Sequence, residues 1–371
     1  MTVLKSAPET ALNANNSPKH PHHLPLRRVL SPTFFLGLAL LVMFAVYVLL
    51  GSYTVTIPDF FTIVINHLTG GEKIPGASFI VMEHKLPRAV VGTMIGLAFG
   101  LAGALFQTML RNPLASPDII GISYGASAAA VTAIVIFGAS GAVVSGAALG
   151  GALGVAAIIY AISRGTGSGA GGGGGSRGNA AGNRLILAGV GIAAALHAVV
   201  NFLMTRADIR TAADALIWLN GSLNSATWDR AGVLGVSLLV LLPAVVVHAG
   251  PLRILELGDD AAAGLGIRVN AARLGLVLTA VGLAAVATAA AGPVAFVAFL
   301  AGPIARRIVR KPSLPASALT GALIVLLADF FASNIAPVVL DGTVLPVGVI
   351  TGALGAPFLL WLLVTSNRKE A

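Results

Sequence analysis

Asp329 is the residue whose type and position could most directly do chemistry, because it lies inside an apolar segment, 315–335, with Asn334 five residues further on. A charged side chain at the centre of a membrane-spanning helix costs about 2.5 to 3.5 kcal/mol, so a carboxylate kept there needs a reason. Asp329 could be a site of proton coupling. The commoner alternative is a local ion pair or a helix cap, and the sequence leaves both open.

Two more polar residues, His197 and Asn201, are spaced i, i+4 and so share one face of the apolar segment 184–204. They could line a polar passage, or they could hydrogen-bond a neighbouring helix. No hydroxyl is placed with a histidine and a carboxylate beyond what chance supplies. The sequence has no cysteine, which excludes disulfides and thiolate metal sites. We therefore expect no catalytic, cofactor or metal site.

The composition indicates a membrane protein. Of the 371 residues, 56% are hydrophobic and only 10% are charged, which is too little charge to cover a soluble globule of this length. The formal net charge of +9 could suggest nucleic acid. However, the basic residues lie singly or in pairs at the ends of apolar segments, where the positive-inside rule expects them. We therefore expect lipid and no nucleic acid as a partner.

Ten apolar windows are long enough to cross the hydrocarbon core of a bilayer. They lie near 33–50, 88–110, 119–137, 142–162, 184–204, 231–248, 273–291, 293–310, 315–335 and 344–364. An even number of spans puts both termini on one side. If that side is the cytoplasm, 17 of the 23 Lys and Arg residues face it, as the positive-inside rule requires. We predict a multi-pass permease domain, 33–364, in the plasma (inner) membrane, between cytoplasmic tails 1–32 (disordered) and 365–371.

A glycine-rich stretch predicts a flexible cytoplasmic loop at 165–182. It is not a phosphate-binding loop, because a Walker motif needs a Gly-Lys-Ser/Thr ending and no lysine has that setting. Nucleotide hydrolysis, if it powers this protein, would take place on another chain. The sequence therefore predicts a subunit that is not itself an enzyme.

Glycines repeat at intervals of four in three windows, a spacing that lets helix backbones approach closely in lipid. The three sets are Gly92, Gly96 and Gly100; Gly121 and Gly125; and Gly146, Gly150 and Gly154. Helix packing explains nearly all of them. A smooth wall for a bulky cargo is the second interpretation.

The loop 253–270 contains a predicted short helix outside the membrane. Asp259 and Asp260 suit its first turn and Gly266 suits its end. Spacing at i, i+4 and i+8 places three side chains in one apolar stripe, as in helices that dock into a groove. These are Leu257, Ala261 and Leu265. The alternative is a helix that lies against its own bundle.

Several motifs in a fixed order then point to a family. They are Leu86-Pro87-Arg88, Gly103-Ala104-Leu105-Phe106-Gln107, Arg111-Asn112-Pro113-Leu114-Ala115, Gly121-Ile122-Ser123, Leu257-Gly258-Asp259-Asp260-Ala261, Gly292-Pro293-Val294-Ala295-Phe296, Arg306-Arg307 and Leu345-Pro346-Val347-Gly348. Through these motifs, the sequence from about 33 to 364 resembles the permeases of iron-siderophore and cobalamin ABC importers, the FecCD or BtuC-like family.

The resemblance implies an all-α, ten-span bundle of the type II ABC importer kind. It implies a second permease, identical or homologous, a cytoplasmic ABC ATPase dimer and an extracytoplasmic substrate-binding protein. In that family, the loop matching 256–268 is the coupling element in the ATPase cleft. The coupling residues that it implies are Glu256, Leu257, Gly258, Asp259, Asp260, Ala261, Leu265 and Gly266.

The resemblance also implies that Lys85 and Arg88, at the outer end of the second span, receive acidic residues of the binding protein. Two positions depart from the family pattern. Gly302-Pro303 replaces a Pro-His pair, and Ser333 stands where cobalamin permeases carry an arginine. A ferric siderophore is therefore the expected cargo, with haem or cobalamin as alternatives and a proton-coupled secondary transporter as the rival class.

Overall fold

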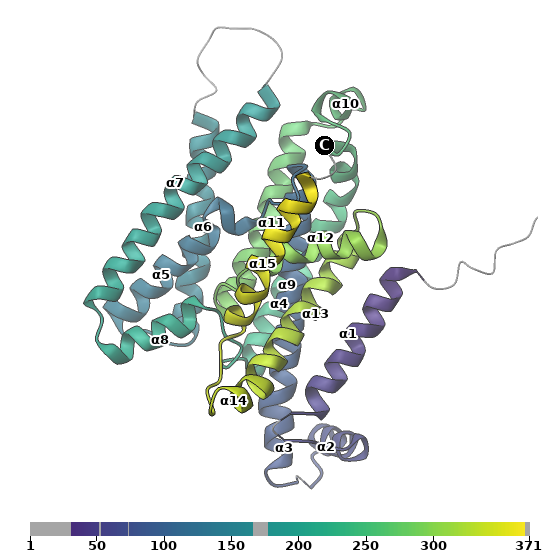
Figure 1. Cartoon of the computed structure of the whole chain (residues 1–371), viewed down its shortest axis with the longest axis vertical. Helices are drawn as coiled ribbons and strands as arrows, with labels where there is room; N and C mark the ends of the chain where they lie inside the picture. Colours follow the sequence, from purple (N-terminus) through teal and green to yellow (C-terminus); the bar gives the residue numbers. More distant parts are fainter. Residues whose placement is uncertain (1–30, 52, 73, 166–176, 368–371) are drawn as a thin grey trace, which may run out of the picture. The chain divides into compact units, whose positions relative to one another are not determined.

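Every regular element in the described part of the chain is helical (Figure 1). The computed structural model describes residues 31–51, 53–72, 74–165 and 177–367, and none of these residues forms a strand. The predicted tail up to residue 30, residues 166–176 of the glycine-rich loop and residues 368–371 lie outside the described residues. The all-α prediction is confirmed.

The elements run in the order α1 (Pro32–Leu49), α2 (Ile57–Thr69), α3 (Ala77–Phe79), η2 (Ile80–Lys85), α4 (Leu86–Met109), η3 (Pro117–Ile120), α5 (Ile122–Phe137), α6 (Ala142–Gly165), α7 (Arg177–Arg206), α8 (Ile209–Leu219), α9 (Trp228–Leu255), α10 (Asp259–Gly264), α11 (Val269–Ala291), α12 (Val297–Val309), α13 (Leu314–Phe330), η4 (Phe331–Ile335), α14 (Ala336–Val339) and α15 (Val347–Asn367). The elements η2 and η4 are π-helical, and η3 is a 3₁₀-helix.

Seven helical segments are long and apolar enough to cross a membrane, counting only the described residues. They are Pro32–Leu49, Ala77–Met109, Ala142–Ile159, Gly189–Arg206, Trp228–Leu255, Val269–Ala291 and Leu314–Val339. Two shorter apolar helices, Ile122–Phe137 and Val347–Leu362, occupy the third and tenth predicted windows. Together with α12, these helices account for all ten windows.

The eighth window, 293–310, was predicted as a continuous span and is shorter. Its helix α12 begins only at Val297 and has 13 residues, about 20 Å at 1.5 Å per residue. That is less than the hydrocarbon thickness of about 30 Å. The non-helical residues before it are partly or fully buried by neighbouring helices, which is the setting in which irregular backbone is tolerated at membrane depth.

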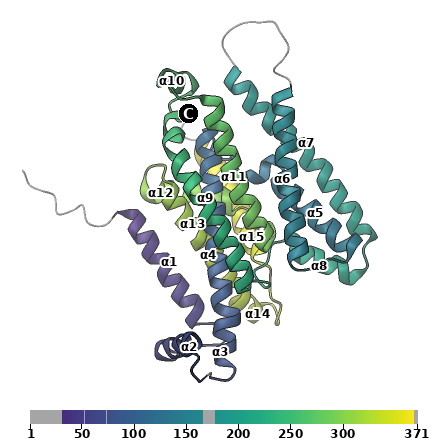
Figure 2. The ribbon, with the colours of Figure 1, turned by 180° about the vertical axis from the view of Figure 1, so that it is seen from behind.

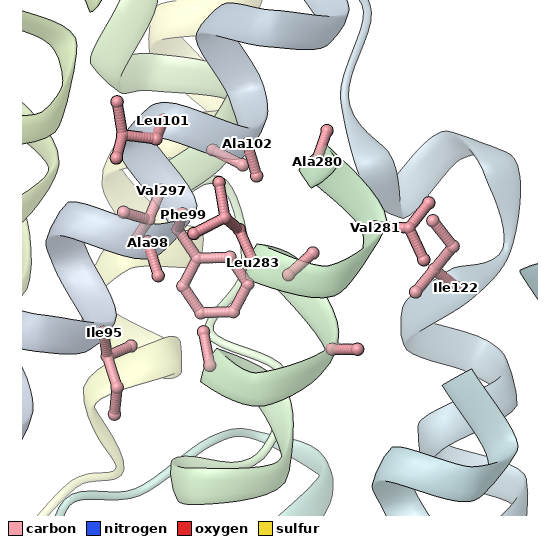
Figure 3. Close-up of a cluster of buried hydrophobic side chains, with 14 of the residues drawn as sticks. Ile95, Ala98, Phe99, Leu101, Ala102, Ile122, Ala280, Val281, Leu283 and Val297 are labelled. Carbon is pink, nitrogen blue, oxygen red and sulfur yellow. The ribbon is translucent and has the colours of Figure 1, made fainter. Parts of the chain in front are cut away.

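Helix α4 is the centre of the described bundle, with α9, α11, α12 and α13 packed around it. Figure 3 shows part of the core, in which Phe99 of α4 lies against Leu283 of α11 and close to Val297 of α12. All three side chains are buried. Most of the side chains of α4 are buried as well, which explains why its sequence is apolar on every face.

Glycines let α4 contact its neighbours through the backbone. A Cβ atom at Gly96 would lie 2.4 Å from the Cα of Ala322, and one at Gly103 would lie 1.8 Å from the carbonyl oxygen of Ala298. Only a residue without a side chain allows such approach. The packing interpretation of the α4 glycines is confirmed.

The α6 glycines do not fit that interpretation within this chain. A Cβ at Gly146, Gly150 or Gly154 would meet no atom within 4 Å. The packing glycine of α6 is instead Gly151, where a Cβ would lie 2.3 Å from the carbonyl oxygen of Gly125. The spacing of the glycines was recognised correctly, but the face on which α6 packs was not.

A second close backbone contact brings together Gly221 of the α8–α9 turn, Gly292 of the α11–α12 connection and Gly348 in the first turn of α15. A Cβ at Gly348 would lie 1.7 Å from the carbonyl oxygen of Asn220, and one at Gly292 would lie 2.3 Å from that of Trp218. The Gly348 N–H donates to the Gly221 carbonyl at 3.3 Å. This contact joins the start of α15 to the α8–α9 and α11–α12 connections.

The start of α1 and the end of α15 point toward the end of the bundle that carries α10, while α2, α3, α8 and α14 lie toward the other end (Figure 1).

Helices α2 and α8 were not predicted, although both have clear start signals. Thr56 caps α2, and Asp208 caps α8 by accepting from the N–H groups of Arg210 and Thr211. The bonds from Thr211 lower the pKa of the exposed Asp208 carboxyl.

Candidate functional site

Helix α10 has the form that its sequence predicts. Asp259 and Asp260 occupy its first turn after Gly258, whose φ of 110° favours glycine. The chain turns away at Gly266, with a φ of 84°. Ala262 faces the bundle and is fully buried. The prediction of a short helix between α9 and α11 is confirmed.

The apolar stripe of α10 is turned away from the rest of the chain. Leu257 is 68% exposed and Leu265 is 63% exposed, and Ala261 between them is exposed as well. An exposed pair of leucines suits a surface that another protein covers. The helix itself does lie against its own bundle, through the buried Ala262 and the Asp259–Arg273 pair, while the stripe is left uncovered. Its docking role stays a prediction.

Asp259 fixes α10 to two helices of the core. Its carboxylate accepts from Arg273 Nη2 of α11 at 2.9 and 3.0 Å, and Arg111 Nη2 lies 3.7 Å from it. Arg111 follows α4 in a left-handed conformation, with a φ of 51°. A displacement of α10 can thus be passed to α4 and α11. The sequence analysis missed this cluster, because no local spacing joins these three residues.

At the opposite end, Asp329 is fully buried in a paired site. Arg88 Nε donates to Asp329 Oδ2 at 2.7 Å, and Arg88 Nη2 donates to Oδ1 at 2.8 Å. The Tyr47 hydroxyl also donates to Oδ2. A two-point arginine–carboxylate pair holds the charge of both groups in a fixed geometry. Asp329 therefore forms an ion pair, which is the commoner of its two predicted roles.

Lys85 donates hydrogen bonds to backbone carbonyl groups at and just after the end of α1. Its Nζ donates to the carbonyl oxygen of Val48 at 3.1 Å and to that of Leu50 at 2.8 Å, with Tyr53 as a third acceptor. A helix leaves its last carbonyl groups without partners, and a lysine can satisfy them. Lys85 and Arg88 thus both have internal partners, and their docking role stays a prediction.

His197 and Asn201 lie on the exposed face of α7. The His197 ring meets the Tyr124 ring of α5 edge to face, with centroids 5.8 Å apart. Since both side chains are exposed, they can line a surface shared with another molecule. Whether that surface is a cargo path stays a prediction.

The two departures from the family pattern have local explanations. Gln107 is 2% exposed and donates to the carbonyl oxygen of Phe299 at 3.0 Å. A Cβ at Gly302 would lie 1.9 Å from Gln107 Oε1, so the glycine makes room for this amide. The Ser333 hydroxyl donates to the backbone carbonyl of Asp329 and remains within its own helix.

Comparisons with known proteins agree with this fold and this arrangement. The FecCD transport family matches residues 39–365, and the chain belongs to that family. It is therefore a polytopic membrane permease.

Several relatives carry the name of a cargo, and two of them illustrate the match. The chain is 35% identical over 302 residues to the ferric enterobactin transport system permease protein FepG of Escherichia coli (strain K12), covering 81% of this chain and 87% of FepG. It is 34% identical to the Fe(3+)-citrate import system permease protein YfmE of Bacillus subtilis (strain 168), covering 93% and 98% of the two chains. These identities extend over nearly the whole membrane domain.

A solved structure shares the fold. It is described as an inward-facing conformation of a metal-chelate type ABC transporter, with a TM-score of 0.72 and 22% identity. The match covers 90% of this chain and 98% of that one. The predicted type II importer bundle is confirmed.

Proposed function

We propose that this chain is the permease subunit of an ABC importer that moves ferric siderophores across the plasma (inner) membrane, driven by a separate ATPase dimer. The family and the relatives named for ferric enterobactin and ferric citrate support the cargo class. One structural observation carries the mechanism. The leucine stripe of α10 is exposed at the end of the bundle, where an ATPase cleft can receive it.

The end that carries α10 faces the cytoplasm in this proposal. Basic residues gather there, as the positive-inside rule expects for that side. They include Arg253, Arg268, Arg306, Arg310 and Lys311. Both termini then lie in the cytoplasm, and Lys85 and Arg88 lie near the outer face.

Transport in this proposal is alternating access. Closure of the ATPase dimer moves the coupling residues 256–266, and Asp259 passes that movement to α4 and α11 through Arg111 and Arg273. The cargo path lies between this chain and a second permease, identical or homologous. The binding protein selects the cargo, so the path itself does not need to bind it tightly. Weak binding along the path then lets the cargo leave faster.

The rival mechanism, proton coupling at Asp329, makes an opposite prediction. Asp329→Asn alone is a poor test, since removing one partner of a buried ion pair costs about 3 to 5 kcal/mol. That loss would lower the amount of folded protein under either mechanism. Replacing the whole cluster by apolar groups of similar size is often neutral or stabilising.

We therefore expect the triple variant Tyr47→Phe, Arg88→Met, Asp329→Leu to fold and to keep at least about half of the ATP-driven uptake. Uptake of radioactive ferric siderophore per folded permease is the measurement. The single variant Asp329→Asn is the comparison, and we expect it to give a lower yield of folded permease. Uptake is measured at saturating binding protein, because the triple variant also lacks the proposed docking charge of Arg88. A triple variant that is folded and binds the binding protein but is inactive would favour a coupling role for the carboxylate.

We also propose that Lys85 and Arg88 guide an acidic binding protein to the outer face. Reversing both charges would disturb the fold, because both residues have internal partners. Lys85→Gln keeps a donor for the α1 carbonyl groups and removes only the charge. We expect it to weaken affinity for the purified binding protein about two- to fivefold, more at low salt. Unchanged affinity at low salt would exclude docking by Lys85.

A further inference from the structure

A large half-open cavity is lined by residues of α4, α9, α12 and the α12–α13 connection. Figure 2 shows the helices that surround it. Its volume is about 890 Å³, near the upper end of the range of about 300 to 1,000 Å³ that small-molecule sites occupy. Leu101 and Ala104 of α4 form part of its floor, and Leu242 and Val246 of α9 form part of one wall. Of the predicted coupling residues, Glu256 lines the cavity, and the predicted path residues His197 and Asn201 do not.

The cavity is mostly apolar, with the buried Gln107, Thr108 and Ser317 as polar lining residues, and it is basic at one end. Arg253, Arg306 and Lys311 line the end nearest α10, with Glu256 as the acidic residue among them. All three cations are exposed, and among the described residues none of them forms an ion pair with a carboxylate. The mouth therefore carries a formal charge of about +2 that no anionic group of the described chain neutralises.

The apolar part continues from this mouth along the helices. From Arg253 to Leu242 the cavity follows eleven residues of α9, about 16 Å at 1.5 Å per residue. Leu242 and Val246 are exposed, as expected for helix faces that contact lipid. A ligand that fits has an anionic group at one end and a long apolar part at the other.

We infer that this cavity binds an anionic phospholipid, with its phosphate between Arg306 and Lys311 and an acyl chain along α9. Basic sites between helices at the membrane surface are suited to anionic headgroups, because each nearby cation adds to the attraction. A free phosphate would use the cations but not the apolar wall. The graded polarity of the cavity therefore favours the lipid.

Native mass spectrometry of the purified full-length chain tests this inference. The probes are phosphatidylglycerol and phosphatidylcholine with the same acyl chains. We expect wild type to retain phosphatidylglycerol about tenfold more tightly. Arg306→Gln with Lys311→Gln should remove that preference. The control pair Arg268→Gln with Arg310→Gln removes the same charge outside the cavity and should keep the preference.

A second variant distinguishes binding of a lipid from binding of a free anion. Ala249→Phe fills the apolar part of the cavity and leaves its cations in place. It should also weaken phosphatidylglycerol retention about tenfold, and excess inorganic phosphate should not displace the lipid from wild type. Any of three results would overturn the inference. They are equal retention of both lipids by wild type, an Arg306→Gln, Lys311→Gln variant that behaves as wild type, and an Ala249→Phe variant that still binds phosphatidylglycerol as tightly as wild type.

Discussion

Replacing Leu257 and Leu265 together by aspartate is expected to reduce uptake to background while the permease still folds. Both side chains are mostly exposed, so the change removes almost no contact within the chain. In an ATPase cleft, however, each aspartate would be a buried charge without a partner, at a cost of about 3 to 5 kcal/mol. That corresponds to more than about a hundredfold loss of affinity between the two subunits.

The measurement is uptake of radioactive ferric siderophore, together with the amount of ATPase that co-purifies with the permease. Two controls separate docking from general damage. Leu257→Met with Leu265→Met keeps the stripe apolar and should keep uptake. Asn270→Asp adds one charge at an exposed position in the first turn of α11. This position lies at the end of the coupling loop but outside the apolar stripe, so the change should have little effect. Normal uptake by the aspartate pair would show that α10 does not enter a partner.

Gly348→Ala is expected to give little folded permease. The new methyl group would lie 1.7 Å from the carbonyl oxygen of Asn220, so the α8–α9 turn or the start of α15 must move. Overpacking typically costs about 1 to 3 kcal/mol and can cost more where backbone must move, which is a large share of a typical stability of about 5 to 15 kcal/mol. The loss should appear in the yield of monodisperse protein and in the thermal midpoint in detergent.

Gly352→Ala is the matched control, because it makes the same change one turn later in α15. A Cβ at Gly352 would meet no atom within 4 Å. Alanine in a helix interior is favoured over glycine by up to about 1 kcal/mol, so this variant should equal or exceed wild type in stability. Equal behaviour of the two alanine variants would show that the contact of Gly221, Gly292 and Gly348 does not form.

The fold and the form of α10 could be predicted because their signals are local. Apolar length marks the spans, and acidic residues with a following glycine mark α10. The Arg88–Asp329 pair could not be predicted, since its members lie 241 residues apart and no spacing connects them. Likewise, nothing in the sequence around Asp259 indicates that Arg111 lies close to it in the fold.

Other errors came from signals that were present but weighed wrongly. Gly292-Pro293 breaks a helix, yet the apolar window was extended through it, so α12 was predicted too long. Thr56 three residues before Asp59 indicates a helix start, but α2 has only 13 residues and is too short to be recognised as a span by its apolar length. On α6, the spacing of Gly146 and Gly150 predicted packing without determining which face packs, and Gly151 has that role.

The central claim is that this permease is a passive gate moved by a separate ATPase. Uptake of ferric enterobactin, ferric citrate, haem and cobalamin into sealed vesicles tests it most directly. The permease is reconstituted either alone or with its ATPase, binding protein and ATP. We expect uptake of a ferric siderophore only with the ATPase and ATP, and none from an imposed proton gradient. Uptake by the permease alone, driven by that gradient, would contradict the account.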